Sequence, residues 1–288
     1  MKNKLMFLAP VLLMFFYSCS HTKTENKIRV MTFNIRYDNP DDSLNAWPKR
    51  AGQVCNFINT EKPDILGMQE VLWNQYQLLD SVLVDYSSIG VGRNDGARKG
   101  EMNPVFYRKE KFDMIRSITF WLSDFPDEPG SLGWGSSLPR IVTWMEFVEK
   151  KSHKHLFFFN THFANDSESA RLMSSRVLLK EVNKIAKGYP FIISGDFNMP
   201  PTSTGYSILT GPDESVPLFQ DSYVITEKKP SGPVHTFNGF SDDKKTARID
   251  YIFVRNGMKV TDYKTVVRKE HNVFISDHWP VEAVITLD

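Results

Sequence analysis

Polar side chains able to carry out chemistry stand directly after apolar runs at six places in this sequence. The six segments are Thr32-Phe33-Asn34-Ile35-Arg36, Met68-Gln69-Glu70, Asn160-Thr161-His162, Gly195-Asp196-Phe197-Asn198, Arg248-Ile249-Asp250 and Ser276-Asp277-His278. Most of them place a carboxylate, an amide or an imidazole at the edge of a strand-like run. Because the strand ends of a sandwich meet at one rim, we expect these groups to gather in a single site.

Oxygen donors predominate among these polar groups. Glu70, Asp196 and Asp277 contribute carboxylates, and Asn34 or Asn198 contributes an amide. Such donors suit Mg²⁺ or Mn²⁺ far better than zinc, which prefers Cys and His. The sequence therefore predicts a site for a hard divalent cation.

Two histidines of the set have acidic partners available. His278 could pair with Asp250, and His162 could pair with Glu101. An imidazole gains and loses protons near neutral pH, so each pair could serve as a general acid or base. A lone Asp-His dipeptide is more often a surface turn, and it is the recurrence of the pattern that favours a functional site.

The elements that must position these groups follow no regular strand-helix alternation. Apolar runs predict strands at residues 28–33, 64–68, 86–91, 104–108, 117–122, 141–149, 155–161, 191–194, 249–254, 258–267 and 281–287. Helical spacing predicts helices over residues 47–60 and 167–186, the second capped by Gly188. Many strands with few helices favour an α+β fold, a four-layer α/β/β/α sandwich of two packed mixed β-sheets flanked by helices.

Two long loops stand out from this pattern. Residues 92–103 are rich in Gly, Arg and Asn, and residues 123–139 are rich in Pro, Gly and Ser. Loops of this length inside compact domains serve binding or are merely mobile, and both interpretations stay open. Trp134 and Arg140 are candidates for substrate contact beside the rim, although an Arg at the start of a strand is more often solvated or ion-paired.

The amino-terminal residues have the character of a targeting segment. Lys2 and Lys4 precede an apolar run that is too short for a membrane span, which predicts a signal peptide over residues 1–18. Cys19 follows in a segment that resembles a relaxed bacterial lipobox. We therefore expect lipidation of Cys19, a tether over residues 19–27, one domain over residues 28–288 and an extracytoplasmic, membrane-anchored location. A plain secretion signal with an incidental cysteine is the alternative.

Composition and charge limit the partners of the chain. Its 288 residues are 41% hydrophobic and 24% charged, as in an ordinary globular protein that needs no disulfides. Loss of residues 1–18 removes two lysines and changes the formal net charge from +1 to −1. This near neutrality argues against tight binding of long nucleic acids, but not against a nuclease that only visits its substrate. No obligate protein partner is evident.

Taken in order, the six segments resemble the endonuclease/exonuclease/phosphatase superfamily of deoxyribonuclease-like, metal-dependent phosphoesterases. The resemblance spans residues 29–287, and its most specific pieces are Gly195-Asp196-Phe197-Asn198 and Ser276-Asp277-His278-Trp279-Pro280. It implies that Glu70 is the principal metal ligand, with Asn34 and Asp277 completing the shell of the ion.

The same resemblance implies catalytic roles for the remaining groups. Asp196 and Asn198 would orient the attacking water and hold a phosphate oxygen, and His278, braced by Asp250 or Asp277, would act as a base or stabilise developing charge. Glu101 would orient His162, which would protonate the leaving oxygen. Arg36 joins Asn198, Arg140 and Trp134 as a substrate-binding residue.

The function expected from the sequence is hydrolysis of phosphoester bonds with Mg²⁺ or Mn²⁺. A phosphodiesterase or nuclease-like enzyme is the first interpretation, and the substrate could equally be a phospholipid or sphingolipid headgroup or a sugar phosphate. A catalytically silent surface protein that binds a phosphorylated ligand is the alternative from another class. It is disfavoured because such a protein would normally have lost an essential residue.

Overall fold

The computed structural model describes residues 26–211, 218–243, 246–270 and 272–287. The predicted signal peptide, Cys19 and most of the predicted tether lie outside the described residues. In the part of the chain that the structure describes, no helix combines the length and the apolar character needed to cross a membrane.

The first strand, β1 (Lys27–Asn34), shows why the protein is layered. Val30 belongs to the core between two sheets, whereas its neighbour Met31 packs in the core that includes Val54 and Ile58 of α1 (Trp47–Glu61). Successive side chains of a strand point to opposite faces, so a strand that is apolar at both positions needs a cover on each side. A second sheet covers one face and helices cover the other.

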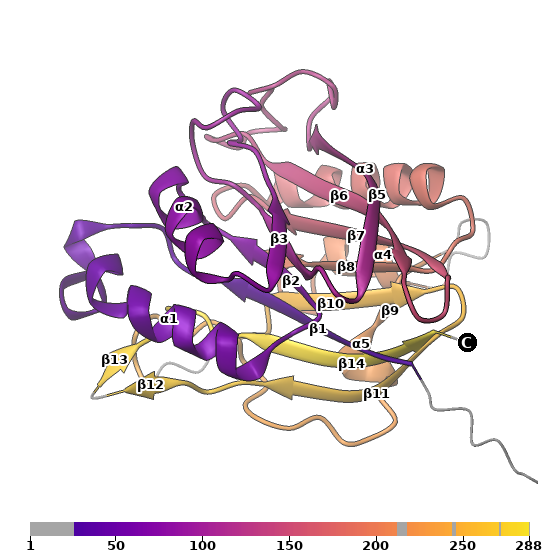
Figure 1. Cartoon of the computed structure of the whole chain (residues 1–288). Helices are drawn as coiled ribbons and strands as arrows, with labels where there is room; N and C mark the ends of the chain where they lie inside the picture. The colour runs from indigo at the N-terminus through magenta and orange to yellow at the C-terminus, as the bar shows by residue number, and fades with distance from the viewer. Residues whose placement is uncertain (1–25, 212–217, 244–245, 271, 288) are drawn as a thin grey trace, which may run out of the picture.

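Two six-stranded mixed sheets pack face to face (Figure 1). The first sheet has the order β11 (Met258–Thr265), β14 (Val281–Leu287), β1, β2 (Ile65–Gln69), β4 (Val105–Arg108) and β3 (Tyr86–Ile89). The second has the order β5 (Phe112–Trp121), β6 (Ile141–Glu149), β7 (His155–His162), β8 (Phe191–Asp196), β10 (Asp250–Arg255) and β9 (Gln220–Asp221). A short pair, β12 (Lys269–Glu270) and β13 (Val273–Phe274), stands apart.

Helices form the two outer layers. Beside α1 they are the 3-10 helix η1 (Pro40–Asn45), α2 (Trp73–Val82), α3 (Glu168–Ala186) and α4 (Thr204–Thr210), whereas the short α5 (Ser222–Ile225) packs against the core between the sheets. Leu79 of α2 shares the core of α1, and Leu178 of α3 and Leu209 of α4 share a core with β7 and β8. The predicted four-layer α/β/β/α sandwich is confirmed.

Several predicted elements changed in extent. The strand predicted at residues 117–122 begins earlier, at Phe112, because it continues past a bulge between Met114 and Arg116. Helix α2 was not predicted because only Gln75 and Leu79 of its ten residues are buried, too few for an apolar stripe. Helix α3 matches its prediction, with Ser167 as N-cap and the chain leaving through Lys187 and Gly188 at positive φ.

Strand register brings the six polar segments to one edge. Asn34 lies opposite Gln69 in the parallel pair β1–β2, and His162 lies opposite Asp196 in the parallel pair β7–β8. The first residue of β10, Asp250, lies opposite Asp196 in turn. Parallel strands end at the same side of a sheet, so the carboxyl ends of four strands meet at a single rim.

Candidate active site

Asn34 connects the two sheets at this rim. Its side-chain Nδ2 donates to Glu70 Oε1 at 3.0 Å and to Asp196 Oδ2 at 3.0 Å, so one amide spans β1, the end of β2 and β8. Its Oδ1 accepts from the backbone N–H of Arg36 at 3.0 Å. The predicted gathering of strand-end residues from both sheets therefore occurs, with Asn34 at its centre.

His278 lies in a buried group of carboxylates. Its Nδ1 is 2.9 Å from Asp250 Oδ2, and its Nε2 is 3.7 Å from Asp196 Oδ2. Burial works against the charged imidazolium, but the charges of Asp250, Asp196 and Asp277 outweigh it and raise the pKa of His278 well above its usual value. The surrounding carboxylates therefore favour the protonated form of His278.

Asp196 is the carboxylate shared by both sides of the site. It is almost fully buried, and its Oδ1 accepts from the backbone N–H of Asn198 at 2.9 Å. Burial, together with the charge of Asp250, raises the pKa of Asp196 to about 7, against the opposing effect of His278. The group can thus exchange a proton near neutral pH.

Glu70 and Asp277 face each other across a guanidinium group. Nη1 of Arg36 lies 3.9 Å from Glu70 Oε2, and Nε of Arg36 lies 3.9 Å from Asp277 Oδ2. The same guanidinium makes a two-pronged ion pair with Asp42 of η1 at 2.9 and 3.0 Å. Burial raises the pKa of Asp277, and the nearby charge of Glu70 raises it further. Two carboxylates that repel each other around a cationic group make a place suited to a positive ion.

The donor chemistry separates two possible cation sites. One ligand atom each from Asp196, Asp250 and His278 lie within 4.8 Å of one another. The His278 imidazolium, however, has no lone pair to offer while Asp250 holds its Nδ1 proton. Glu70 and Asp277 offer carboxylate oxygens, to which Asn34 can add its amide Oδ1, and 14% and 10% exposure of the Glu70 and Asp277 side chains keeps both reachable from solvent. The second set fits Mg²⁺ or Mn²⁺ better.

His162 occupies the other side of Asp196. Its Nε2 lies 3.0 Å from Nδ2 of Asn198, which also donates to the Phe163 carbonyl at 3.0 Å. An amide nitrogen only donates, so Nε2 of His162 accepts and the ring is neutral. Burial lowers the pKa of His162 well below its usual value, and the charges of Arg140 and Arg93 lower it further.

Glu101 is held primarily by an arginine and not by His162. Arg93 grips both carboxylate oxygens of Glu101 at 2.8 and 2.9 Å, whereas Nδ1 of His162 lies 3.8 Å away and makes no hydrogen bond. This contact of Arg93 was not predicted from the sequence. Its place in a Gly-Arg-Asn segment eight residues before Glu101 was the available signal, but such a fork depends on how the loop folds back.

Arg140 and Trp134, the two substrate-contact candidates of the long loop, are placed differently. Arg140 is buried, and its Nη2 donates to Asn165 Oδ1 at 3.1 Å. Trp134 is half-buried, and its backbone carbonyl accepts from the Ser167 hydroxyl at 3.0 Å at the start of α3. Arg140 is thus close enough for its positive charge to act on His162, whereas Trp134 is bonded to the N-cap residue of α3.

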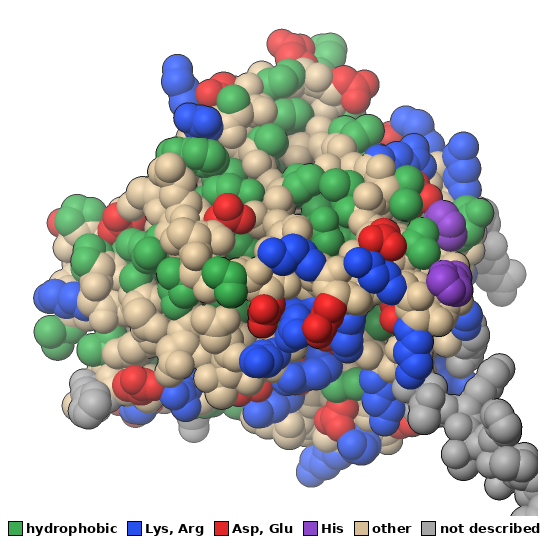
Figure 2. Space-filling model, in the orientation of Figure 1, with side chains coloured by type: hydrophobic (Ala, Val, Ile, Leu, Met, Phe, Trp, Pro, Cys, Tyr) green, Lys and Arg blue, Asp and Glu red, His purple; other side chains and the backbone are tan. Residues whose placement is uncertain are grey.

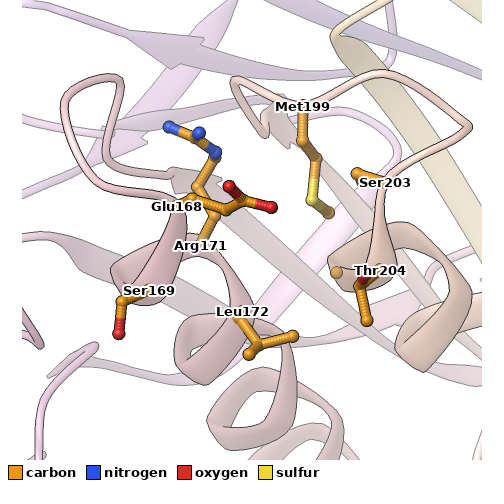
Figure 3. A pocket seen from close by; sticks show the side chains of 8 residues that line it. Glu168, Ser169, Arg171, Leu172, Met199, Ser203 and Thr204 are labelled. Atoms are coloured by element: carbon orange, nitrogen blue, oxygen red, sulfur yellow. The ribbon is translucent and has the colours of Figure 1, made fainter.

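A cavity of about 250 Å³ lies between α3 and α4 (Figure 3). Met199, next in sequence to Asn198, forms part of its wall. Arg171 lines it too and donates to the carbonyls of Ala164 and Asn165, directly after the His162 strand. Glu168 and Thr204 add polar groups, so the cavity suits a small polar ligand.

A buried polar network joins the sheets directly behind Glu70. Asn160 Oδ1 accepts from Gln69 Nε2 at 2.7 Å and from Ser194 Oγ at 3.0 Å, and Asn160 Nδ2 donates to the Met68 carbonyl at 2.7 Å. Gly67 leaves room for it, since a Cβ there would lie 2.2 Å from Ser194 Oγ. This network was not predicted from the sequence, because its members lie on strands of two different sheets and contact one another only in the folded protein.

Three residues of the predicted set have backbone conformations that L-residues rarely adopt. Arg36, Glu70 and Asn198 have φ of 59°, 63° and 50°. Such conformations cost free energy and persist only when the surroundings hold them. Among the described residues, three of the ten non-glycine residues with positive φ therefore belong to the predicted site.

Comparison with known proteins agrees with this geometry. The Endonuclease/Exonuclease/phosphatase family matches residues 31–278. An endonuclease/exonuclease/phosphatase from Bacteroides vulgatus is 38% identical, with a TM-score of 0.86 over 92% of this chain and 100% of that chain. A mannosyl-6-phosphatase from Bacteroides thetaiotaomicron is 32% identical, with a TM-score of 0.82 over 90% of this chain and 100% of that chain.

A curated relative extends the comparison to nucleases. A probable RNA exonuclease of Schizosaccharomyces pombe is 26% identical over 207 residues, which are 65% of this chain and 39% of that protein. The family resemblance predicted from the six segments is confirmed. With its fold, its rim of strand-end residues and a family match over most of its length, the chain belongs to the Endonuclease/Exonuclease/phosphatase family, whose members are phosphoester hydrolases.

Proposed function

We propose that this protein is a Mg²⁺- or Mn²⁺-dependent phosphomonoesterase that acts on a small soluble substrate, a sugar phosphate being the first candidate. The observation that carries the proposal is Asn34, whose amide joins Glu70 on one side and Asp196 on the other at 3.0 Å each. It links a cation-binding group of carboxylates to a proton-exchanging group of Asp and His. Hydrolysis of a phosphate ester needs both.

Asn34, Glu70 and Asp277 would hold the divalent ion. When bound, the ion would neutralise phosphate charge and so make the phosphorus accessible to a nucleophile. Without the ion, the positive charge of the Arg36 guanidinium balances the negative charges of Glu70 and Asp277. With the ion bound, Arg36, held by Asp42 through Nε and Nη2, would contribute its positive charge to an anionic substrate beside the ion.

Proton movement is assigned to Asp196 and His278. Asp196, whose pKa of about 7 suits exchange at neutral pH, would accept a proton from the attacking water, with Asn198 orienting the phosphate. The His278 imidazolium, braced by Asp250 at 2.9 Å, would donate from Nε2 to a phosphate oxygen as its negative charge grows. This favours charge stabilisation over a base role for His278.

Three observations support a small phosphomonoester over a nucleic acid. The structural neighbour described as a mannosyl-6-phosphatase is more similar over its full length than the RNA exonuclease is. On the face in Figure 2, the Lys and Arg side chains gather toward the lower right and acidic side chains lie among them, so this side of the molecule shows no purely basic surface of the kind that a nucleic-acid backbone attracts. The cavity of about 250 Å³ between α3 and α4, whose wall includes Met199 next to Asn198 in the sequence, is of a size for a sugar-like group.

The proposal is tested with the full chain and a panel of phosphate esters. Sugar phosphates, inositol phosphates, sphingomyelin, RNA and bis-p-nitrophenyl phosphate are each incubated with MgCl₂, with MnCl₂ and with EDTA. We expect metal-dependent release of phosphate from a sugar phosphate and a loss of about a thousandfold for Asp196→Asn. Metal-independent turnover, or cleavage of RNA or lipid alone, would contradict the proposal.

His155→Gln is the control for Asp196→Asn. His155 is also paired with a carboxylate, Glu146, at 3.1 Å, but its side chain is 41% exposed and it begins β7, at the far end of the strand from His162. Its activity should equal that of the unchanged protein. Loss of activity in this control would mean that the assay reports folding and not the site.

The lipid anchor at Cys19 remains a proposal about residues outside the described part. Strand β1 begins at Lys27 and reaches the site at Asn34, about 25 Å further along at the usual rise per residue. An anchored domain would thus present its site away from its amino-terminal end, which suits a soluble substrate. Mass spectrometry of the membrane fraction tests the anchor, since Cys19→Ala should abolish acylation.

A further inference from the structure

Arg50 is a buried charge whose hydrogen-bond acceptors are all backbone carbonyls, three of them next to or near candidate metal ligands in the sequence. It lies in the first turns of α1 and is fully buried in the layer between this helix and the first sheet. Burial lowers the pKa of Arg50 to about 10, so it stays protonated at neutral pH. A buried guanidinium is costly unless its N–H groups are satisfied.

Four backbone carbonyls satisfy it. Nε donates to the Asn45 carbonyl at 2.7 Å, and Nη2 donates to the Arg36 carbonyl at 2.7 Å. Nη1 donates to the carbonyls of Ile35 and Ile275, the latter at 3.0 Å. Ile35 and Arg36 directly follow Asn34, and Ile275 stands two residues before Asp277. One side chain therefore joins two of the three segments that carry candidate metal ligands.

Because peptide bonds are planar, the hydrogen bonds of Arg50 to these carbonyls also fix the N–H groups that bind Asn34 and Glu70. The Ile35 carbonyl and the Arg36 N–H belong to one peptide unit, and the Arg36 carbonyl and the Tyr37 N–H belong to the next. The Arg36 N–H donates to Asn34 Oδ1 at 3.0 Å, and the Tyr37 N–H donates to Glu70 Oε2 at 3.1 Å. Arg50 thus holds the carbonyl sides of two consecutive peptide units whose N–H sides orient Asn34 and Glu70.

The peptide units that Arg50 binds include a residue, Arg36, in an unfavourable backbone conformation. Arg36 has φ of 59°, a left-handed conformation unfavourable for a residue with a side chain. A second buried donor, Nε2 of Gln75 in α2, binds the Arg36 carbonyl at 2.9 Å. Two side chains from two helices therefore converge on one strained peptide, which is expected where its direction matters.

We propose that Arg50 is a positioning residue for the divalent cation: through the peptide units after Asn34 it fixes the directions of the Asn34 amide and the Glu70 carboxylate. The proposal rests on the proposed function, since it needs the ion at Asn34, Glu70 and Asp277. Arg50 touches neither the substrate nor the ion. Its removal should weaken metal binding more than it weakens the fold.

The test measures Mn²⁺ binding to the full chain without substrate, by calorimetry and by the electron paramagnetic resonance signal of free Mn²⁺. Arg50→Lys keeps the charge but cannot reach four carbonyls. We expect its Kd for Mn²⁺ to rise by about tenfold or more, as for other groups that orient metal ligands. The melting temperature in EDTA should fall by only a few degrees.

Arg29→Met is the matched control. Arg29 lies at the other end of β1 and donates to the carbonyl of Glu61, the last residue of α1, and to Glu282 at 2.7 Å. It therefore links the same strand and helix, but away from the rim. We expect a lower melting temperature with an unchanged Kd for Mn²⁺. Equal weakening of Mn²⁺ binding in both variants would mean general loosening of α1 and would overturn the proposal.

Gln75→Leu keeps the test decisive if Arg50→Lys does not fold. It removes the second donor to the Arg36 carbonyl, and we expect the Kd to rise about threefold, the effect of one hydrogen bond. A wild-type Kd in every folded variant overturns the positioning role and leaves the proposed function intact. Absence of Mn²⁺ binding in the unchanged protein overturns both.

Discussion

His278 and His162 lie on opposite sides of Asp196, and the Nε2 atoms of both face the same carboxylate oxygen, at 3.7 and 3.5 Å. Both rings are almost fully buried, so desolvation disfavours the charged form of each. The neighbours differ. His278 is surrounded by carboxylates that raise its pKa, and His162 faces Arg140 and Arg93, which lower it.

The comparison separates two tasks that burial alone would not distinguish. The His278 side holds a positive charge inside the protein, ready to meet negative charge that develops on a phosphate. The His162 side holds a neutral ring that accepts a hydrogen bond from Asn198 at 3.0 Å and so positions that amide. Equal burial with opposite charge surroundings is how one cleft keeps two histidines in different protonation states.

Asp250→Asn should remove the positive charge of His278 and cause the largest fall in kcat. The substitution keeps the size of the side chain but removes the charge that sustains the imidazolium. We expect kcat at pH 7 to fall about a thousandfold, and the pKa of His278 to fall toward its usual value. Steady-state kinetics with saturating Mg²⁺ and a histidine NMR titration measure the two effects.

Asp262→Asn provides the comparison for that variant. Asp262 pairs with Lys228 on the surface, and its removal should leave kcat unchanged. If Asp250→Asn retained more than a tenth of the activity, the charge of His278 would have no part in the reaction.

The parts of the fold and of the candidate site that could be predicted from the sequence are those marked by residues close together in the chain. The polar residues Glu70, Asp196 and Asp277 were predictable because each follows an apolar run within a few positions, and two sheets must bring strand ends together. Helix α2 was not, because a helix that buries two side chains leaves almost no periodicity.

Long-range polar contacts were beyond sequence reasoning for a different physical reason. Arg50 stands in a helix that reads as an ordinary amphipathic one, and nothing near it marks a guanidinium whose four acceptors come from three segments. The Arg93 fork onto Glu101 depends likewise on the path of the loop, in which the Arg93 N–H binds the Glu101 carbonyl at 3.0 Å. Such contacts exist only once the chain has folded.

His162→Gln should sharpen the comparison with a smaller effect. If the neutral ring mainly positions Asn198, kcat should fall about a hundredfold, and by the same factor for p-nitrophenyl phosphate and an alkyl phosphate. A larger loss with the alkyl phosphate, whose leaving oxygen needs a proton, would instead restore the acid role implied by the family resemblance. Paired measurements on the two substrates decide between these roles.

The smallest effect is a dependence of stability on pH that has opposite signs for the two histidines. The pKa of His162 in the folded protein lies below its value of about 6.5 in the unfolded chain. Below about pH 6.5 the unfolded chain therefore binds a proton that the folded protein does not bind, and the stability of the fold falls as the pH drops. The folded pKa of His278 lies above 6.5, so its contribution is fully present below about pH 6.5 and is lost as the pH rises through the folded pKa.

Urea unfolding of the metal-free protein at pH 5 and pH 7.5 measures both contributions. The free energy of unfolding of the unchanged protein, minus that of His162→Gln, should be smaller at pH 5 than at pH 7.5. The corresponding difference for His278→Gln should be larger at pH 5. Each change is limited to about 1.4 kcal/mol per pH unit, because one proton is involved. Changes of the same sign in both variants would mean that the two rings share one electrostatic environment, and the contrast between the two sides of Asp196 would not hold.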